Sequence, residues 1–168
     1  MTSQTQKLRP LVEETRLILL DLHKKLIDIG RSDFEKTNGP IASLYDWVPI
    51  LVGHPFFSFL HPLSQLITSL DELLEITWPL REIDILAVRA EIENMIGDFK
   101  TTPQGFRTHY LEMIQRESEV VLLHSKLKTA LQKFPTIDYT KMLEYLNIRQ
   151  QWTTATKLKR PTGKPGNS

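Results

Sequence analysis

The sequence predicts an all-α protein, an irregular antiparallel helical bundle of about six or seven helices. Apolar residues recur every three or four positions through most of the chain, which is the spacing of one helix face. Proline and glycine separate these segments. No segment alternates apolar and polar residues as a half-buried strand does. The 168 residues suffice for one core, so we expect a single helical domain over residues 1–156, with residues 1–8 frayed.

The first helix is expected over residues 10–36, because proline suits a first helical turn and Gly39-Pro40 stops a helix. Leu17, Leu20 and Ile27 fall outside its main apolar face. A helix that is apolar on more than one side is typically central in its bundle or faces a partner. The main face itself comprises Leu8, Leu11, Thr15, Ile18, Leu22, Leu26 and Ile29.

The segment over residues 41–53 contains the pattern of a short helix. Ser43, with Asp46 three residues later, resembles a capping pair. Pro49 lies in the same segment and predicts that this helix is broken or begins late, because proline lacks the backbone N–H.

The clearest helix is expected over residues 55–75. Pro62 lies inside it and predicts a kink or two collinear pieces. In an α-helical register Phe57 falls on the polar side, together with His61. The buried seam alternates steps of four and three residues and comprises Phe56, Leu60, Leu63, Ile67, Leu70 and Leu74, widened by Phe59, Leu66 and Leu73.

Phe57 is therefore the most informative residue for function, and two interpretations stay open. In the first, Trp47, His54, Phe57 and His61 form an interaction surface in which Phe57 is an exposed aromatic anchor. In the second, the segment that carries Tyr45 and Trp47 folds over the Phe57 ring. Burial of Phe57 distinguishes the two.

The second half of the chain predicts three or four further helices. One covers residues 80–96 and ends at Gly97, another begins at Thr102-Pro103, and Ser118-Glu119 can cap the next. The pattern leaves open whether residues 103–134 form one bent helix or two. Asp138 can cap a final helix over residues 139–152, with Met142, Leu143, Leu146 and Trp152 as its apolar contacts.

From Thr153 onward the apolar pattern fades, and residues 157–168 are expected to be a basic disordered tail. The tail contains Lys157, Lys159, Arg160 and Lys164 and no acid. It has the charge to attract RNA, DNA or an anionic membrane, although without interleaved aromatic residues a solubilising role is favoured. We therefore expect no specific nucleic-acid partner.

No residue pattern specifies a reaction, and we assign no catalytic, metal or cofactor residues. The chain has no cysteine, and none of its five histidines lies three residues after a glutamate, as bundle metal sites require. It also has no Gly-x-Ser-x-Gly elbow and no phosphate-binding glycine loop. No signal sequence or unbroken apolar span is present, so a cytoplasmic protein with no membrane span is expected.

The segments Gly39-Pro40-Ile41, His54 through Ser64 (His-Pro-Phe-Phe-Ser-Phe-Leu-His-Pro-Leu-Ser) and Leu70-Asp71-Glu72 resemble those of a family of small uncharacterised bacterial all-helical proteins. The resemblance covers about residues 10–130 and includes Leu22-His23-Lys24. It implies a bacterial cytoplasmic origin and carries no activity, cofactor or site residue.

The leading hypothesis is a non-enzymatic protein-protein interaction or scaffold module, with a protein partner or a homodimer. It rests on the lack of catalytic patterns and on the surplus apolar helix faces. An alternative is a bundle that binds an apolar or tetrapyrrole-like molecule, with a histidine as the polar contact. An enzyme of unrecognised type is the third.

Overall fold

The computed structural model describes residues 6–97 and 104–159. Seven α-helices and three short 3-10 helices make up this part of the chain, which contains no strand. The prediction of an all-α helical bundle is therefore confirmed. The α-helices are α1 (Arg9–Asn38), α2 (Leu44–Gly53), α3 (His61–Glu75), α4 (Glu82–Ile96), α5 (Gln104–Arg116), α6 (Ser118–Gln132) and α7 (Met142–Lys159), and the 3-10 helices are η1 (Gln6–Leu8), η2 (Pro55–Leu60) and η3 (Tyr139–Lys141).

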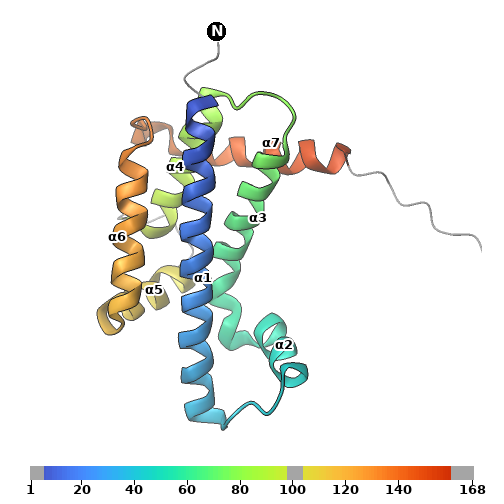
Figure 1. Cartoon of the computed structure of the whole chain (residues 1–168), viewed down its shortest axis with the longest axis vertical. Coiled ribbons are helices and arrows are strands. Elements are labelled where there is room, and N and C mark those ends of the chain that lie inside the picture. The colour runs from blue at the N-terminus through green and yellow to red at the C-terminus, as the bar shows by residue number, and fades with distance from the viewer. Residues whose placement is uncertain (1–5, 98–103, 160–168) are drawn as a thin grey trace, which may run out of the picture.

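The long helix α1 is the axis of the bundle, with α3 and α6 packed along it (Figure 1). Helix α7 crosses one end of the bundle and packs on α3 and α4, whereas α2 projects beside the other end of α1. The predicted main apolar face of the first helix is largely buried, but Leu8 and Ile18 are only half-buried. Val12 and Leu19, which were not predicted to belong to this face, are buried as well. Of the surplus apolar residues, Leu17 is exposed and Leu20 and Ile27 are half-buried.

Helix α2 begins as its sequence predicts, because the Ser43 side chain accepts a hydrogen bond from the Asp46 backbone N–H. The expectation that Pro49 breaks or delays this helix is wrong, since Pro49 lies inside it. Only one intrahelical bond is lost at a proline, and α2 is short and has a solvent-facing side on which Pro49 is exposed. The helix then ends at Gly53.

The segment after α2 contains the largest departure from the predicted register. Residues 55–60 form the 3-10 helix η2, and α3 follows it, so Pro62 lies in the first turn of α3. Of the two predicted outcomes, a kink or two pieces, the second is correct, because η2 and α3 are separate helices. A 3-10 helix has three residues per turn, so Phe57 and Leu60 share one side of η2, and both are buried. Phe56, predicted to be in the buried seam, is instead 40% exposed.

The helices of the second half begin and end close to their predicted positions. Helix α4 ends before Gly97, and α5 and α6 are two separate helices divided at Glu117. Asp138 caps η3 by accepting a hydrogen bond from the Thr140 backbone N–H. The predicted start at Thr102-Pro103 lies outside the described residues.

Helix α7 extends beyond residue 156, where the sequence pattern predicts the domain to end, and runs to Lys159. The buried side of this helix includes Tyr145, Trp152 and Thr156, and Thr156 donates a hydrogen bond to the Trp152 carbonyl. Leu143, predicted as an apolar contact, is 75% exposed. Residues 157–159, expected to belong to the disordered tail, are helical, and the expected disorder of residues 160–168 falls on residues that the structure does not describe.

None of the described helices is by itself both long and apolar enough to cross a membrane. Helix α2 and the segment Pro55–Glu75 meet the length and composition criteria only when taken together, as a pair bent by 64°.

Candidate interaction surface

Trp47 and Phe57, two of the four predicted surface residues, pack against each other inside the protein. Their ring centroids are 5.2 Å apart in a T-shaped arrangement, and Phe57 is 1% exposed. A Cβ atom at Gly30 of α1 would lie 3.0 Å from the Phe57 ring, so the glycine permits this close approach. The interpretation of Phe57 as an exposed anchor is wrong, and the alternative, in which the Trp47 segment covers the ring, is correct.

The other two residues of the predicted surface, His54 and His61, are exposed. His54 has a structural role, because its Nδ1 accepts a hydrogen bond from the Phe56 backbone N–H at 3.1 Å and caps η2. Its ring also meets the Phe34 ring edge-on at 5.0 Å. His61 is the first residue of α3. Because two of the four residues are buried, the four do not form one exposed patch.

The exposed apolar surface in this region lies on α2 instead. Leu44, Tyr45, Val48 and Val52 are 73%, 93%, 52% and 69% exposed. Residues one or two turns apart on a helix lie on the same face, so these side chains form a continuous stripe, called here the α2 stripe. The helix sequence, Leu-Tyr-Asp-Trp-Val-Pro-Ile-Leu-Val-Gly, contains one charged residue, Asp46. An apolar stripe of this kind on a surface helix is typical of a binding surface.

One side chain attaches α2 to the bundle. Trp47 is the sole fully buried residue of this helix, and the Arg31 guanidinium of α1 lies over its ring at 5.0 Å. Ile50 and Leu51 are half-buried beside it. Because the Trp47 side faces inward, the opposite side of α2 presents the stripe to solvent.

No family model, curated protein or solved structure matches this chain.

Three histidines are held by neighbouring side chains inside or at the edge of the bundle. His23 Nε2 lies 2.9 Å from Ser64 Oγ, and His124 Nδ1 lies 2.6 Å from Tyr110 Oη. Burial lowers the pKa of both histidines and raises the pKa of the Tyr110 hydroxyl. His109 stacks on Phe59 with ring centroids 4.4 Å apart. Within residues 6–97 and 104–159, no three side chains of the metal-binding types lie close enough to hold an ion.

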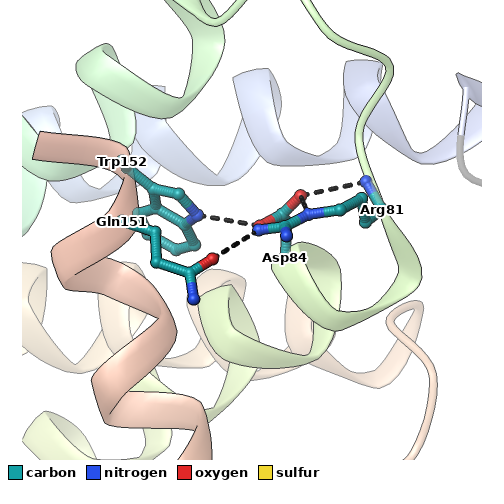
Figure 2. A network of polar contacts seen from close by, with 4 residues as sticks. All are labelled: Arg81, Asp84, Gln151 and Trp152. Carbon is teal, nitrogen blue, oxygen red and sulfur yellow. Dashed lines mark hydrogen bonds and ion pairs between the residues drawn. The ribbon is translucent and has the colours of Figure 1, made fainter. Parts of the chain in front are cut away.

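A network of polar contacts around the buried Asp84 carboxylate fixes α7 against the start of α4 (Figure 2). The fully buried Asp84 carboxylate accepts a hydrogen bond from Trp152 Nε1 at 2.9 Å and pairs with the Arg81 guanidinium at 2.8 Å. Arg81 in turn donates to the Gln151 side chain at 2.9 Å. Burial alone would raise the pKa of Asp84, but hydrogen bonds from Arg81 and Trp152 outweigh it and hold this pKa below its usual range.

Sequence reasoning did not find this network or a second buried acid on the same helix, Glu91. A signal for both exists, because Asp84, Val88, Glu91 and Met95 follow one another at helical spacing and all four are buried. Acidic residues on the apolar face of a predicted helix indicate buried, partnered carboxylates.

Proposed function

We propose that this protein is a non-enzymatic interaction module that self-associates through the α2 stripe. The observation that carries the proposal is the composition and exposure of α2. Leu44, Tyr45, Val48 and Val52 remain largely in solvent on a helix that has a single charge. Exposing a contiguous apolar face costs solubility, and such faces commonly mark protein contacts.

A second copy of the chain is the partner that the stripe fits. The stripe carries no charge, so two copies can oppose each other across a two-fold axis without bringing like charges together. The four residues present an area on the order of 500 Å² per copy, the size of a functional apolar patch on a monomer. Two copies then bury about 1,000 Å², which is the lower bound for a specific interface and predicts a weak, concentration-dependent dimer.

A lipid surface is a poorer match for the same helix. Helices that lie in an anionic membrane interface carry lysine and arginine on their polar face. Helix α2 has neither, and its one charged residue is Asp46. The stripe also belongs to a ten-residue helix, so its apolar surface is small for stable membrane anchoring.

The test is analytical ultracentrifugation over a wide range of protein concentration, with Val48→Asp as the disrupting variant. Val121→Asp is the matched control, because Val121 is an exposed valine on α6, 44% exposed against 52% for Val48. We expect the wild type and Val121→Asp to dimerise in the micromolar range or just above it, and Val48→Asp to stay monomeric.

Circular dichroism must show that both variants keep the wild-type helix content, as expected for exposed sites. A wild type that stays monomeric at several hundred micromolar overturns self-association, as does an equal effect of the two variants. Sedimentation of the protein with phosphatidylcholine and phosphatidylserine vesicles, abolished by Val48→Asp, would assign the stripe to membranes instead.

A further inference from the structure

A polar groove lies between α3, α4 and α7, and none of its lining residues belongs to α2. Its volume is about 540 Å³, within the range of sites for small molecules. Glu72 of α3, Glu91 of α4 and Arg149 of α7 line it, together with the hydroxyls of Thr68, Ser69 and Thr153. The Asp84–Trp152 contact shown in Figure 2 fixes the part of α7 that supplies Arg149 and Thr153.

The wall of the groove contains an ion pair between Glu91 and Arg149 in which only one of the two Glu91 oxygens accepts a hydrogen bond from the described residues. Arg149 Nη1 donates to Glu91 Oε2 at 3.1 Å, and Arg149 Nε donates to Ser69 Oγ at 2.8 Å. The Glu91 side chain is 7% exposed, yet its second oxygen accepts no hydrogen bond from any residue that the structure describes. Burial raises the pKa of Glu91, and Arg149 opposes this shift. A buried carboxylate oxygen without a protein donor is costly, and a donor on water or on a bound molecule in the groove relieves that cost.

Three of the four hydroxyl groups that line the groove have already used their protons. Thr68 donates to the Ser64 carbonyl, Ser69 to the Gln65 carbonyl, and Thr153 to Glu72 Oε2 at 2.7 Å. Each hydroxyl therefore offers a bound molecule only lone pairs. The remaining donors of the lining are the side-chain amides of Gln65 and Gln150 and the other N–H groups of Arg149, and the acceptors include the oxygens of Glu72 and Glu91.

The charges of the lining residues favour a cationic ligand. Two carboxylates, Glu72 and Glu91, face a single cation, Arg149, so the lining carries a net charge of about −1. Arg149 uses two of its five N–H groups on Glu91 and Ser69, and it is the net negative charge of the lining that disfavours an anion at this position. Leu146 supplies an apolar wall next to these groups.

We propose that this groove binds a small aliphatic amine, with ammonium groups donating to Glu91 and Glu72 and methylene groups lying against Leu146. An ammonium group brings three donors and a positive charge, which supplies what the Glu91 oxygen and the negatively charged lining lack. A linear diamine or polyamine has a second ammonium for the second carboxylate. The inference does not depend on self-association through α2.

The experiment is isothermal titration calorimetry of the full chain with spermidine, at low and at physiological salt. Glu72→Gln is the main variant, because a glutamine oxygen can still accept the Thr153 hydroxyl while the charge is lost. Glu144→Gln is the matched control, since Glu144 is exposed on α7 outside the groove and its loss changes the net charge by the same amount. We expect one spermidine per chain, about tenfold weaker binding for Glu72→Gln, and unchanged binding for Glu144→Gln.

Glu91→Gln provides a second variant at the buried end of the groove, and urea denaturation shows whether it remains folded. A folded Glu91→Gln protein should also bind spermidine at least about tenfold more weakly. If Glu91→Gln does not fold, Glu72→Gln alone decides the outcome. Equal weakening by Glu72→Gln and Glu144→Gln would show diffuse charge attraction and overturn the site. No measurable heat with spermidine, or binding of succinate in its place, would overturn the proposal as well.

Discussion

Replacing Asp84 by asparagine keeps the shape of the side chain and removes its charge, which tests the contact between α4 and α7. The two carboxylate oxygens accept four hydrogen bonds, at 2.8–3.0 Å, from the Arg81 backbone N–H, Arg81 Nε, Arg81 Nη2 and Trp152 Nε1. Each oxygen accepts two of them. An amide has one acceptor oxygen and one NH₂ group, so in either orientation two of the four donors face another donor.

The expected loss follows from these bonds. Removing one partner of a fully buried ion pair costs about 3–5 kcal/mol. Arg81 is 44% exposed and can turn toward water, which lowers that cost. We therefore expect Asp84→Asn to reduce the free energy of unfolding by about 2–4 kcal/mol, equivalent to a drop in Tm of roughly 5–15 °C for a chain of this size.

Urea denaturation at neutral pH measures this loss, and its pH dependence identifies the cause. The pKa of Asp84 is lower in the folded protein than in the unfolded chain. Its stabilising effect is therefore complete above the unfolded pKa of about 3.9 and is lost as the pH falls through the folded pKa. The difference between wild type and Asp84→Asn should be constant from about pH 5 to pH 8 and shrink below about pH 4.

Asp21→Asn is the matched control, because Asp21 is exposed in the middle of α1, and its effect should stay within about 0.5 kcal/mol. Two results would refute the reasoning on Asp84. One is a loss below about 1 kcal/mol at neutral pH. The other is a loss of unchanged size at a pH below the folded pKa of Asp84, where the protonated Asp84 of the wild type and the asparagine of the variant are both uncharged.

Two further predictions concern the core of η2 and α3. Leu63→Ala should lower the free energy of unfolding by about 2–5 kcal/mol, since Leu63 is fully buried, and a neutral result in urea denaturation would mean that α3 is turned differently. Phe57→Ser should cost about 3 kcal/mol or more in the same assay, whereas Phe56→Ser, at a partly exposed ring, should cost clearly less. The reverse order for the two phenylalanines would contradict the 3-10 register of η2.

The helices, their order and several of their ends were predictable because they depend on local patterns. The cap at Ser43 joins residues three positions apart, and that at Asp138 joins residues two apart. Gly97 directly follows the last residue of α4. Spacing, capping and helix-stopping residues act within one or two turns, so a single sequence displays them fully.

The register around Phe57 was not predictable from spacing alone. If residues 55–60 form an α-helix, Phe56 is the ring on the buried side. If they form a 3-10 helix, the neighbouring Phe57 is buried instead. What selects the 3-10 form is tertiary packing, in which Phe57 meets Trp47 of α2 and the open side of Gly30 on α1. The sequence therefore located the aromatic cluster correctly but assigned exposure to the wrong phenylalanine.

Helix α7 was predicted to be too short because its buried face contains polar residues. That face follows Met142, Tyr145, Arg149, Trp152 and Thr156 at helical spacing. A prediction from the spacing of apolar residues does not count Arg149 or Thr156, so the apolar pattern of this helix fades after Trp152. The partners that make these positions favourable, Glu91 and Glu72, lie on other helices.

The contacts that hold α7 on α4 also position residues of the proposed amine site. Asp84 meets Trp152 across 68 positions of the sequence, and Glu91 meets Arg149 across 58. Both contacts join α4 to α7, and Arg149 and Thr153 belong to the same turns of α7 as Trp152. Loosening the Asp84–Trp152 contact should therefore displace one wall of the groove as well as lower stability. If the groove binds amines, Asp84→Asn should weaken spermidine binding without changing any group that touches the ligand, and spermidine should in turn raise the unfolding midpoint of the wild type.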